Sequence, residues 1–300
     1  MRVRRLAMAL TAVGALTLGL TACGGGDSGG DTSAAAGDGS VVDKIKNTKR
    51  VVVGTKWDQP ALGLKSGAGE PEGFDVDVAK YVIKELAGGE DVDIEWKESA
   101  SSNREAFLAN GTVDIIFATY SITEERKGKV TFGGPYIVAH QDTMVRADAN
   151  DITKATDLAG KRICQAAGSN SYKRITDPPP DGQLDLDAEL VGAANYSECV
   201  AKLAGNNLDA VTTDDLILAG FAMQDAQRGG GNFKILGDPF TDEKYGVGLK
   251  KGDTKTCEAV NAAIKKMYED GTAKQLLDKW FGKTQGLTLP TEAPEPEGCS

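Results

Sequence analysis

The chain has 300 residues, of which 40% are hydrophobic and 26% are charged. This composition is typical of a soluble globular protein that is long enough for roughly two domains. The formal net charge is −10 at pH 7. A surface this acidic is a poor partner for nucleic acid or for anionic membrane lipids, so the composition argues against both classes of partner.

The first 22 residues have the pattern of a secretory signal. Arg2, Arg4 and Arg5 precede an apolar stretch that ends at Leu20, and such a segment is a targeting signal rather than a structural helix. The sequence Leu-Thr-Ala-Cys at residues 20–23, followed by glycine, resembles the bacterial lipoprotein signal, in which the cysteine is lipidated and becomes the first residue. We therefore expect cleavage of residues 1–22 and a lipid on Cys23, with palmitate as one acyl chain; the alternative is a secreted protein with an unrelated cysteine.

Residues 23–43 are expected to form a lipidated cysteine and a flexible tether. Residues 24–40 consist mainly of Gly, Ser, Asp and Ala, without hydrophobic periodicity. A random coil of that length spans roughly 20–25 Å. The predicted location of the folded body is therefore the extracellular face of the cell membrane, close to the lipid anchor.

Four cysteines remain, which is an even number for an oxidising compartment. Three pairings are possible. The Cys164–Cys199 pair is favoured because both residues belong to predicted elements of the same half of the chain. The Cys257–Cys299 pair would then fasten the Pro- and Glu-rich tail, residues 284–300, to the body; the alternative is two thiols. No cysteine or histidine spacing indicates a metal site.

Strands and helices alternate along the body, which predicts an α/β fold. In the first half, strands are expected over 50–55, 92–96 and 113–118, and helices over 75–86 and from the Ser101-Ser102 cap to Leu108. In the second half, strands are expected over 162–166 and 208–213, and helices over 197–203 and 215–221.

Two similar segments indicate two halves of related build. FLANGTVDII (107–116) and KLAGNNLDAV (202–211) each run from a leucine through a turn to an aspartate that opens a buried strand. The first strand is followed by Thr119 and Ser121, and the second ends in Thr212 and Thr213. Because ligands of open α/β sheets bind beyond the carboxyl ends of strands, these hydroxyls are candidates for a binding site.

A set of motifs in this order resembles a known family. The motifs are GTKWDQPALGLK (54–65), GFDVDVAKYV (73–82), ANGTVDIIFATYSITEERKGKVTFGGPYIV (109–138), GSNS (168–171), LDAVTTDD (208–215) and YGVGLKK (245–251). They are similar to the polar-amino-acid-binding proteins of ABC importers, and most similar to glutamate-binding lipoproteins of Gram-positive actinobacteria. The resemblance covers nearly all of residues 50–282.

The resemblance implies a two-lobe α/β fold of the periplasmic-binding-protein type, with two crossover segments and a ligand cleft between the lobes. The first lobe would comprise residues 44–142 and 242–283, and the second residues 147–235. YIVAHQDTMVR (136–146) and KILGDPF (234–240) would supply the crossovers. His140 in the first crossover is expected to be structural, and residues 133–136 (GGPY) are expected to form a turn.

The resemblance also suggests how a free amino acid would be held. Burying its carboxylate and ammonium costs several kcal/mol for each ion unless both are paired. Arg126 matches the family's carboxylate-binding arginine and offers a planar fork; the alternative is a surface charge. Thr119 and Ser121 would assist, as would the backbone N–H groups of Ser169 and Asn170. Asp214 matches the ammonium-binding acid; the alternative is a helix N-cap.

A further set of residues would decide which amino acid is bound. Lys56 and Arg104 match positions where binders of acidic amino acids hold the side-chain carboxylate, and Ser101 could assist. A neutral ligand such as glutamine would leave a buried positive charge uncompensated, so glutamate is favoured. Trp57 is expected beside the methylene chain of the ligand, with an ordinary core or lid tryptophan as the alternative, and Tyr196 is expected to face the cleft.

The predicted function is therefore that of a monomeric, lipid-anchored extracellular receptor for L-glutamate that delivers its ligand to an ABC permease. Its predicted partners are that permease and, through the permease, the ATPase. The alternatives are a receptor for glutamine or aspartate, a sensor domain, or a dehydratase-type enzyme on the same fold. No histidine lies in the motifs and no nucleophile is paired with a base, so we expect no catalytic residues, cofactor or metal.

Overall fold

The computed structural model describes residues 39–180 and 182–299. Cys23, the expected leader and most of the expected tether lie outside the described residues. Among the residues described, no helix is both long and apolar enough to cross a membrane.

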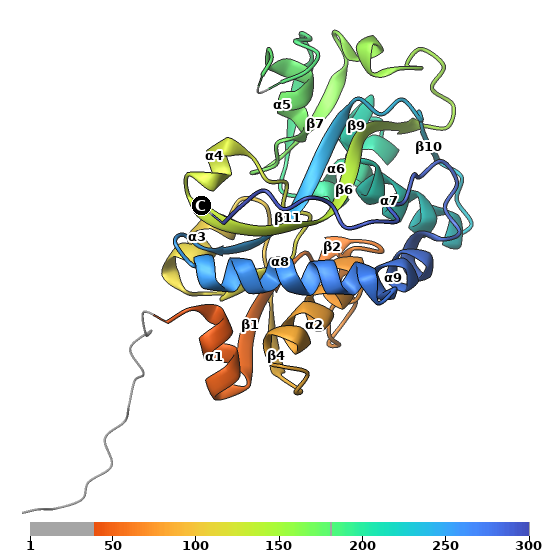
Figure 1. Ribbon diagram of the computed structural model, residues 1–300. Coiled ribbons are helices and arrows are strands. Elements are labelled where there is room, and N and C mark those ends of the chain that lie inside the picture. Colours follow the sequence, from red (N-terminus) through yellow and green to blue (C-terminus); the bar gives the residue numbers. More distant parts are fainter. Residues whose placement is uncertain (1–38, 181, 300) are drawn as a thin grey trace, which may run out of the picture. The chain divides into compact units, whose positions relative to one another are not determined.

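Helices and strands alternate as the sequence predicts (Figure 1). The first part of the chain contains α1 (Val41–Thr48), β1 (Arg50–Thr55), β2 (Asp58–Gln59), β3 (Gly63–Leu64), α2 (Phe74–Leu86), β4 (Asp93–Glu98), α3 (Arg104–Asn110), β5 (Ile115–Ile116) and α4 (Glu124–Lys127). The middle part contains β6 (Val130–Arg146), a 3₁₀ helix at Ala155–Leu158, β7 (Arg162–Ala166), α5 (Ser171–Thr176), β8 (Glu189–Ala193), α6 (Tyr196–Ala204), β9 (Ala210–Asp214), α7 (Asp215–Gln227) and β10 (Phe233–Ile235). The last part contains β11 (Thr241–Lys250), α8 (Thr254–Glu269) and α9 (Thr272–Phe281).

The main sheet contains two parallel triplets of the same build. Its strand order is β4-β1-β5-β11-β6-β9-β7-β8, and β10 pairs with β6. In the first triplet β1 lies between β4 and β5, and in the second β7 lies between β8 and β9, with parallel pairing throughout. The two segments that resemble each other in sequence therefore occupy equivalent places, each leading into an outer strand of its triplet.

Two long antiparallel strands join the two halves. β6 pairs with β11 from Val130 to Gln141 and with β9 from Gln141 to Val145, so it leaves one triplet and enters the other. The fold is therefore the expected two-lobe α/β fold. We call the half that contains β4, β1 and β5 the first lobe, and the half that contains β9, β7 and β8 the second lobe.

Helices cover the sheet and bury its apolar side chains. α2 packs against α8 and α9 in the first lobe (Figure 1), and Phe74, Val78 and Val82 of α2 are fully buried. This matches the helical spacing of apolar residues in the sequence. The tether expected to run to residue 43 is shorter, because Ser40 caps α1 and Val41 and Val42 are buried in it.

Three local expectations were wrong. α3 begins at Arg104 with Asn103 in the N-cap position, so Ser101 and Ser102 do not cap it. The predicted strand over 113–118 is regular only at Ile115–Ile116, although the N–H groups of Asp114 and Phe117 also donate to β1 and every residue of the segment except Asp114 is buried. Residues 133–136, expected to form a turn, lie inside β6. The glycines and the proline fit there because the register between β6 and β11 shifts between Tyr245 and Val247.

Both expected disulfides are present. Cys164–Cys199 ties β7 to α6, and Cys257–Cys299 ties α8 to the tail. The tail is also held by Glu297, whose N–H donates to the Gly134 carbonyl and whose carboxylate pairs with Lys127 at 2.7 Å and with Lys244. The tail is therefore fastened to the first lobe at several points.

Candidate functional site

The carboxyl ends of the parallel strands carry most of the candidate residues. β1 is followed by Lys56, β5 leads to Thr119, β7 leads to Gly168, and β9 ends at Asp214. These strand ends belong to both lobes, and their polar residues are almost completely buried. The topology therefore brings the candidates together where α/β sheets bind ligands.

Arg126 lies between the lobes. It belongs to α4, its side chain is 6% exposed, and its guanidinium donates to the Ser121 carbonyl at 2.8 Å and to the Gly168 carbonyl of the second lobe at 3.2 Å. Its Nε lies 3.8 Å from a carboxylate oxygen of Glu105. A guanidinium held by two carbonyls keeps a fixed orientation, so the alternative of a solvated surface charge does not fit this structure.

Asp214 faces Arg126 from the second lobe. It is 4% exposed and accepts a 2.6 Å hydrogen bond from the Tyr245 hydroxyl of β11. Burial, followed by the charge of the nearby Glu243, raises its pKa to about 8, whereas the Tyr245 hydrogen bond and the charge of Arg126 oppose the shift. Asp214 occupies the N-cap position of α7 but its side chain makes no capping bond, whereas Asp215 accepts from the N–H groups of Leu216 and His140. The Asp214 carboxylate is therefore not used as a helix cap.

Lys56 and Arg104 form a second buried cationic region of the first lobe. The Lys56 ammonium donates to the Ser101 hydroxyl at 2.7 Å. Burial, followed by the charge of Arg104, lowers the pKa of Lys56 to about 7. Arg104 is 1% exposed and donates to the Ala118 carbonyl at 2.9 Å. Its Nε is buried and finds no acceptor within residues 39–180 and 182–299.

Thr119 is held by an acid that the sequence reasoning did not select. Asp75 of α2 is fully buried and accepts the Thr119 N–H and the Tyr136 hydroxyl, each at 2.8 Å. Burial raises the pKa of Asp75 to about 7. Thr119 has a φ of 45°, and its hydroxyl donates to the Gln59 side-chain oxygen at 3.1 Å. A non-glycine residue in this strained region is held by its surroundings, and Asp75 supplies part of that hold.

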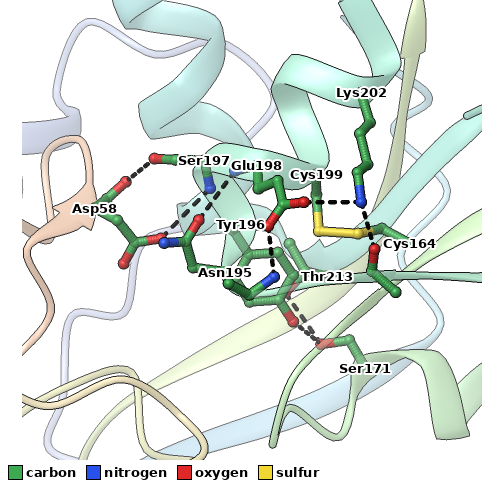
Figure 2. Close-up of a disulfide and its surroundings, with 12 residues drawn as sticks. Asp58, Cys164, Ser171, Asn195, Tyr196, Ser197, Glu198, Cys199, Lys202 and Thr213 are labelled. Atoms are coloured by element: carbon green, nitrogen blue, oxygen red, sulfur yellow. Dashed lines mark hydrogen bonds and ion pairs between the residues drawn. A yellow bond between two sulfur atoms is a disulfide. The ribbon is translucent and has the colours of Figure 1, made fainter. Parts of the chain in front are cut away.

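The second lobe contributes a cluster of hydroxyls beside Asp214. The Tyr196 hydroxyl lies 2.8 Å from the Ser171 oxygen, which lies 3.0 Å from the Thr213 oxygen (Figure 2). The Ser169 N–H, expected to point at the ligand, donates to the Ala166 carbonyl instead, because Gly168 closes a tight turn there. Ser169, Ser171 and Thr213 are buried, so this cluster forms a buried polar region of the second lobe.

The two lobes touch at several points around these residues. Gly168 packs so closely on Ser101 and Ser102 that a Cβ would come within 2.6 Å of their backbone. The Ser197 hydroxyl at the start of α6 donates to the Asp58 carbonyl at 2.8 Å (Figure 2), and Lys173 pairs with Glu125 at 3.3 Å. These contacts describe lobes that are closed on each other.

Trp57 lies at the edge of this region. Its ring is half-buried and carries the Lys65 ammonium 4.0 Å from its centroid. The indole N–H is buried without an acceptor within the described ranges. His140 lies on β6, where its N–H donates to Asp215 beside Asp214 and its Nδ1 lies 3.0 Å from Asp242 across the β6–β11 pair, in keeping with a structural role.

The arrangement suits the binding of a small zwitterion. Arg126 of the first lobe and Asp214 of the second offer a guanidinium and a carboxyl group to the two ends of such a ligand, and Lys56 and Arg104 add two more buried basic side chains in the first lobe. No cluster of three metal-ligating side chains is found among the residues that the structure describes.

Comparison with known proteins decides the family. The model of the bacterial extracellular solute-binding proteins, family 3, matches residues 51–283. The chain belongs to this family. It is therefore a solute-binding protein rather than an enzyme, and the family is extracellular.

Several curated family members are similar over most of their length. The glutamate-binding protein GluB of Corynebacterium glutamicum is 42% identical over 91% of this chain and 88% of its own length. The ABC transporter glutamine-binding protein GlnH of Bacillus subtilis is 36% identical over 87% of this chain and 92% of its own. Among solved structures, an ancestral arginine-binding protein bound to arginine is 31% identical, with a TM-score of 0.69 over 78% of this chain and 99% of its own.

Several residues at the site of this solute-binding protein escaped the sequence reasoning. Asp75, Tyr120 and Ser171 all lie inside motifs that carry the family resemblance, and Glu105 follows Arg104 directly. Their residue types alone favoured ordinary strand, helix or core positions. Only the contacts that they make across the fold distinguish them.

Proposed function

We propose that this solute-binding protein is the receptor of an ABC importer and that it captures L-glutamate by closure of its two lobes. In this proposal Arg126 binds the α-carboxylate and Asp214 binds the ammonium, with Thr119, Ser121, Ser169, Asn170 and Tyr196 around them. Lys56, Ser101 and Arg104 hold the side-chain carboxylate, and Trp57 lies along the methylene chain.

The observation that carries the choice of glutamate is a second buried arginine in the first lobe. Arg126 suffices for the α-carboxylate that all amino acids share. Arg104 is 1% exposed, and its Nε has no acceptor in the described part of the chain. A second carboxylate on the ligand would satisfy it, whereas a neutral side chain would leave a buried charge uncompensated.

The charges around the cleft support a ligand with one net negative charge. The buried cations are Lys56, Arg104 and Arg126, and the buried acids nearest to them are Asp75 and Asp214. With all five groups charged, the cations exceed the carboxylates by one. Protonation of Asp75 or Asp214, whose pKa values are raised to about 7 and about 8, adds to this positive excess, and loss of the proton of Lys56, whose pKa is lowered to about 7, reduces it. Glu105 is 26% exposed beside Arg126, so water screens its charge.

The test is a thermal-shift series with the common amino acids, made on the mature chain without its leader and cysteine. A ligand that binds only the native state raises the melting temperature by mass action. We expect L-glutamate to give the largest shift. If glutamine gives the largest shift, the chain resembles the glutamine-binding relative GlnH in its ligand. If a basic or aromatic amino acid gives it, the assignment of Lys56 and Arg104 is refuted.

The proposed setting is the outer face of the membrane. Lipidated Cys23 and a tether would hold a monomeric body close to its permease. Lobe 1 would comprise residues 44–142 and 242–283, lobe 2 residues 147–235, and the tail residues 284–300. The run of β6 from one lobe to the other supports this division, because a strand shared by both lobes can act as a hinge.

A further inference from the structure

Two buried arginines share one aromatic ring. Tyr120 is fully buried, with its ring centroid 4.0 Å from the Arg104 Cζ and 5.1 Å from the Arg126 Cζ. Phe132 packs edge-on against the ring at 4.7 Å and fixes its orientation. The face of an aromatic ring is electronegative, so it attracts a guanidinium, and more strongly where water is excluded.

The two arginines need such a partner because they repel each other. The charge of Arg126 lowers the pKa of Arg104, after the larger effect of burial, to about 10, whereas Tyr120 and Glu105 oppose this shift. The Tyr120 hydroxyl donates to Glu105 Oε1 at 2.8 Å, and the same oxygen lies 3.8 Å from Arg126 Nε. The ring therefore lies against both arginines where water is excluded, and the partly exposed Glu105 carboxylate adds a weaker, screened attraction.

The arginines depend on the ring to different degrees. Arg126 has carbonyl acceptors from both lobes, Ser121 and Gly168. Arg104 lies closer to the ring and bonds through one terminal nitrogen to the Ala118 carbonyl, with a longer contact of 3.4 Å to Thr119. Loss of the ring should therefore displace Arg104 more than Arg126.

We propose that Tyr120 is a positioning residue that holds Arg104 beside Arg126 and so determines the preference of this site for amino acids with a second carboxylate. The inference rests on the proposed function, in which Arg104 binds the side-chain carboxylate and Arg126 the α-carboxylate. Replacing a residue that only fills the core would change the affinities for all ligands by the same factor. A residue that positions Arg104 affects the affinity for glutamate more than the affinity for glutamine.

The test uses calorimetry with L-glutamate and L-glutamine on four variants and the wild type. Tyr120→Leu removes the ring, and Tyr120→Met does so with a side chain that adapts to irregular cavities. Tyr120→Phe keeps the ring and removes only the hydroxyl. Phe117→Leu is the matched control, because Phe117 is equally buried in the same segment and its ring lies near Tyr136, at 6.2 Å.

We expect Tyr120→Leu and Tyr120→Met to lower the glutamate-to-glutamine affinity ratio by about tenfold, equal to about 1.4 kcal/mol. Tyr120→Phe should keep the ratio within about threefold of the wild type, and Phe117→Leu should lower the melting temperature while leaving the ratio unchanged. The inference would be overturned if a folded variant without the ring kept the wild-type ratio of glutamate to glutamine affinity. It would also be overturned if Tyr120→Phe lowered this ratio as much as Tyr120→Leu does.

A crystal structure of a ring-less variant separates this inference from the proposed function. The inference requires the Arg104 guanidinium to leave its place, whichever ligand the wild type prefers. A wild type that prefers glutamine would refute the proposed function and the selectivity that depends on it, but not the positioning of Arg104 by the ring. An Arg104 side chain that stays in place without the ring would refute the inference alone.

Discussion

Replacing Arg126 with alanine should abolish high-affinity binding of every amino acid by the same factor. The side chain is 6% exposed and its guanidinium donates to carbonyls of both lobes. Truncating one partner of a buried, hydrogen-bonded charge pair costs about 2–5 kcal/mol. This corresponds to a rise in Kd of about 30-fold to about 5,000-fold. Part of the cost is the loss of the Gly168 bond, which connects the lobes when they are closed.

Arg104→Ala should act differently, because Arg104 is assigned to the ligand side chain alone. We expect a large loss of glutamate affinity, whereas residual glutamine binding should change little or improve. The ratio of the two affinities is therefore the quantity that separates recognition of the zwitterion from recognition of the side chain. Arg228→Ala is a suitable control, because Arg228 is exposed at the C-terminal end of α7.

Isothermal titration calorimetry on the three variants, with glutamate and glutamine at one pH, measures both quantities. Circular dichroism checks that each variant is folded. The assignment of Arg126 is refuted if Arg126→Ala changes the ratio while keeping the affinity for either ligand. An Arg104→Ala protein that keeps the wild-type ratio removes Arg104 from the side-chain site.

Three further predictions concern other parts of the molecule. Burial raises the pKa of Asp75 from 3.8 to about 7, so the folded state retains a proton that the unfolded chain releases. This contribution to stability is lost as the pH rises from 3.8 to about 7. In urea denaturation, the stability of Asp75→Asn should therefore depend less on pH than that of the wild type, and parallel pH profiles would contradict the shift. Ser197→Ala removes the hydrogen bond to Asp58 between the lobes, which is worth about 0.5–1.5 kcal/mol. Stopped-flow kinetics should therefore show faster release of all ligands by the same factor. A change in selectivity would argue against a role of Ser197 in lobe closure. Cys23→Ser should release the protein into the medium or leave its signal uncleaved while ligand binding is retained, and an unchanged membrane fraction would rule out the lipid anchor.

Much of the fold could be predicted from the sequence because its signals are local. The strand at 50–55 and the helix at 75–86 were predicted to within a residue, since apolar spacing and a closing glycine pair determine such elements over a few turns. The pairing of Cys164 with Cys199 followed from their places in neighbouring elements. The extent of β6 could not be predicted, because its glycines and proline at 133–135 indicate a turn unless the partner strand is known.

The candidate site divides in the same way. The sequence by itself pointed to four charged residues, Lys56 and Asp214 at strand ends and Arg104 and Arg126 on the short helices α3 and α4, through the pattern of elements and the family resemblance. Tertiary structure alone decided how they are held. Asp75 reaches Thr119 across 44 residues of chain, and Arg126 reaches Gly168 across 42. Tyr120 contacts Arg104 only because the fold packs α3 against the strand end. Contacts between distant segments leave no periodic trace in the sequence, so burial and partners became visible only in the folded chain.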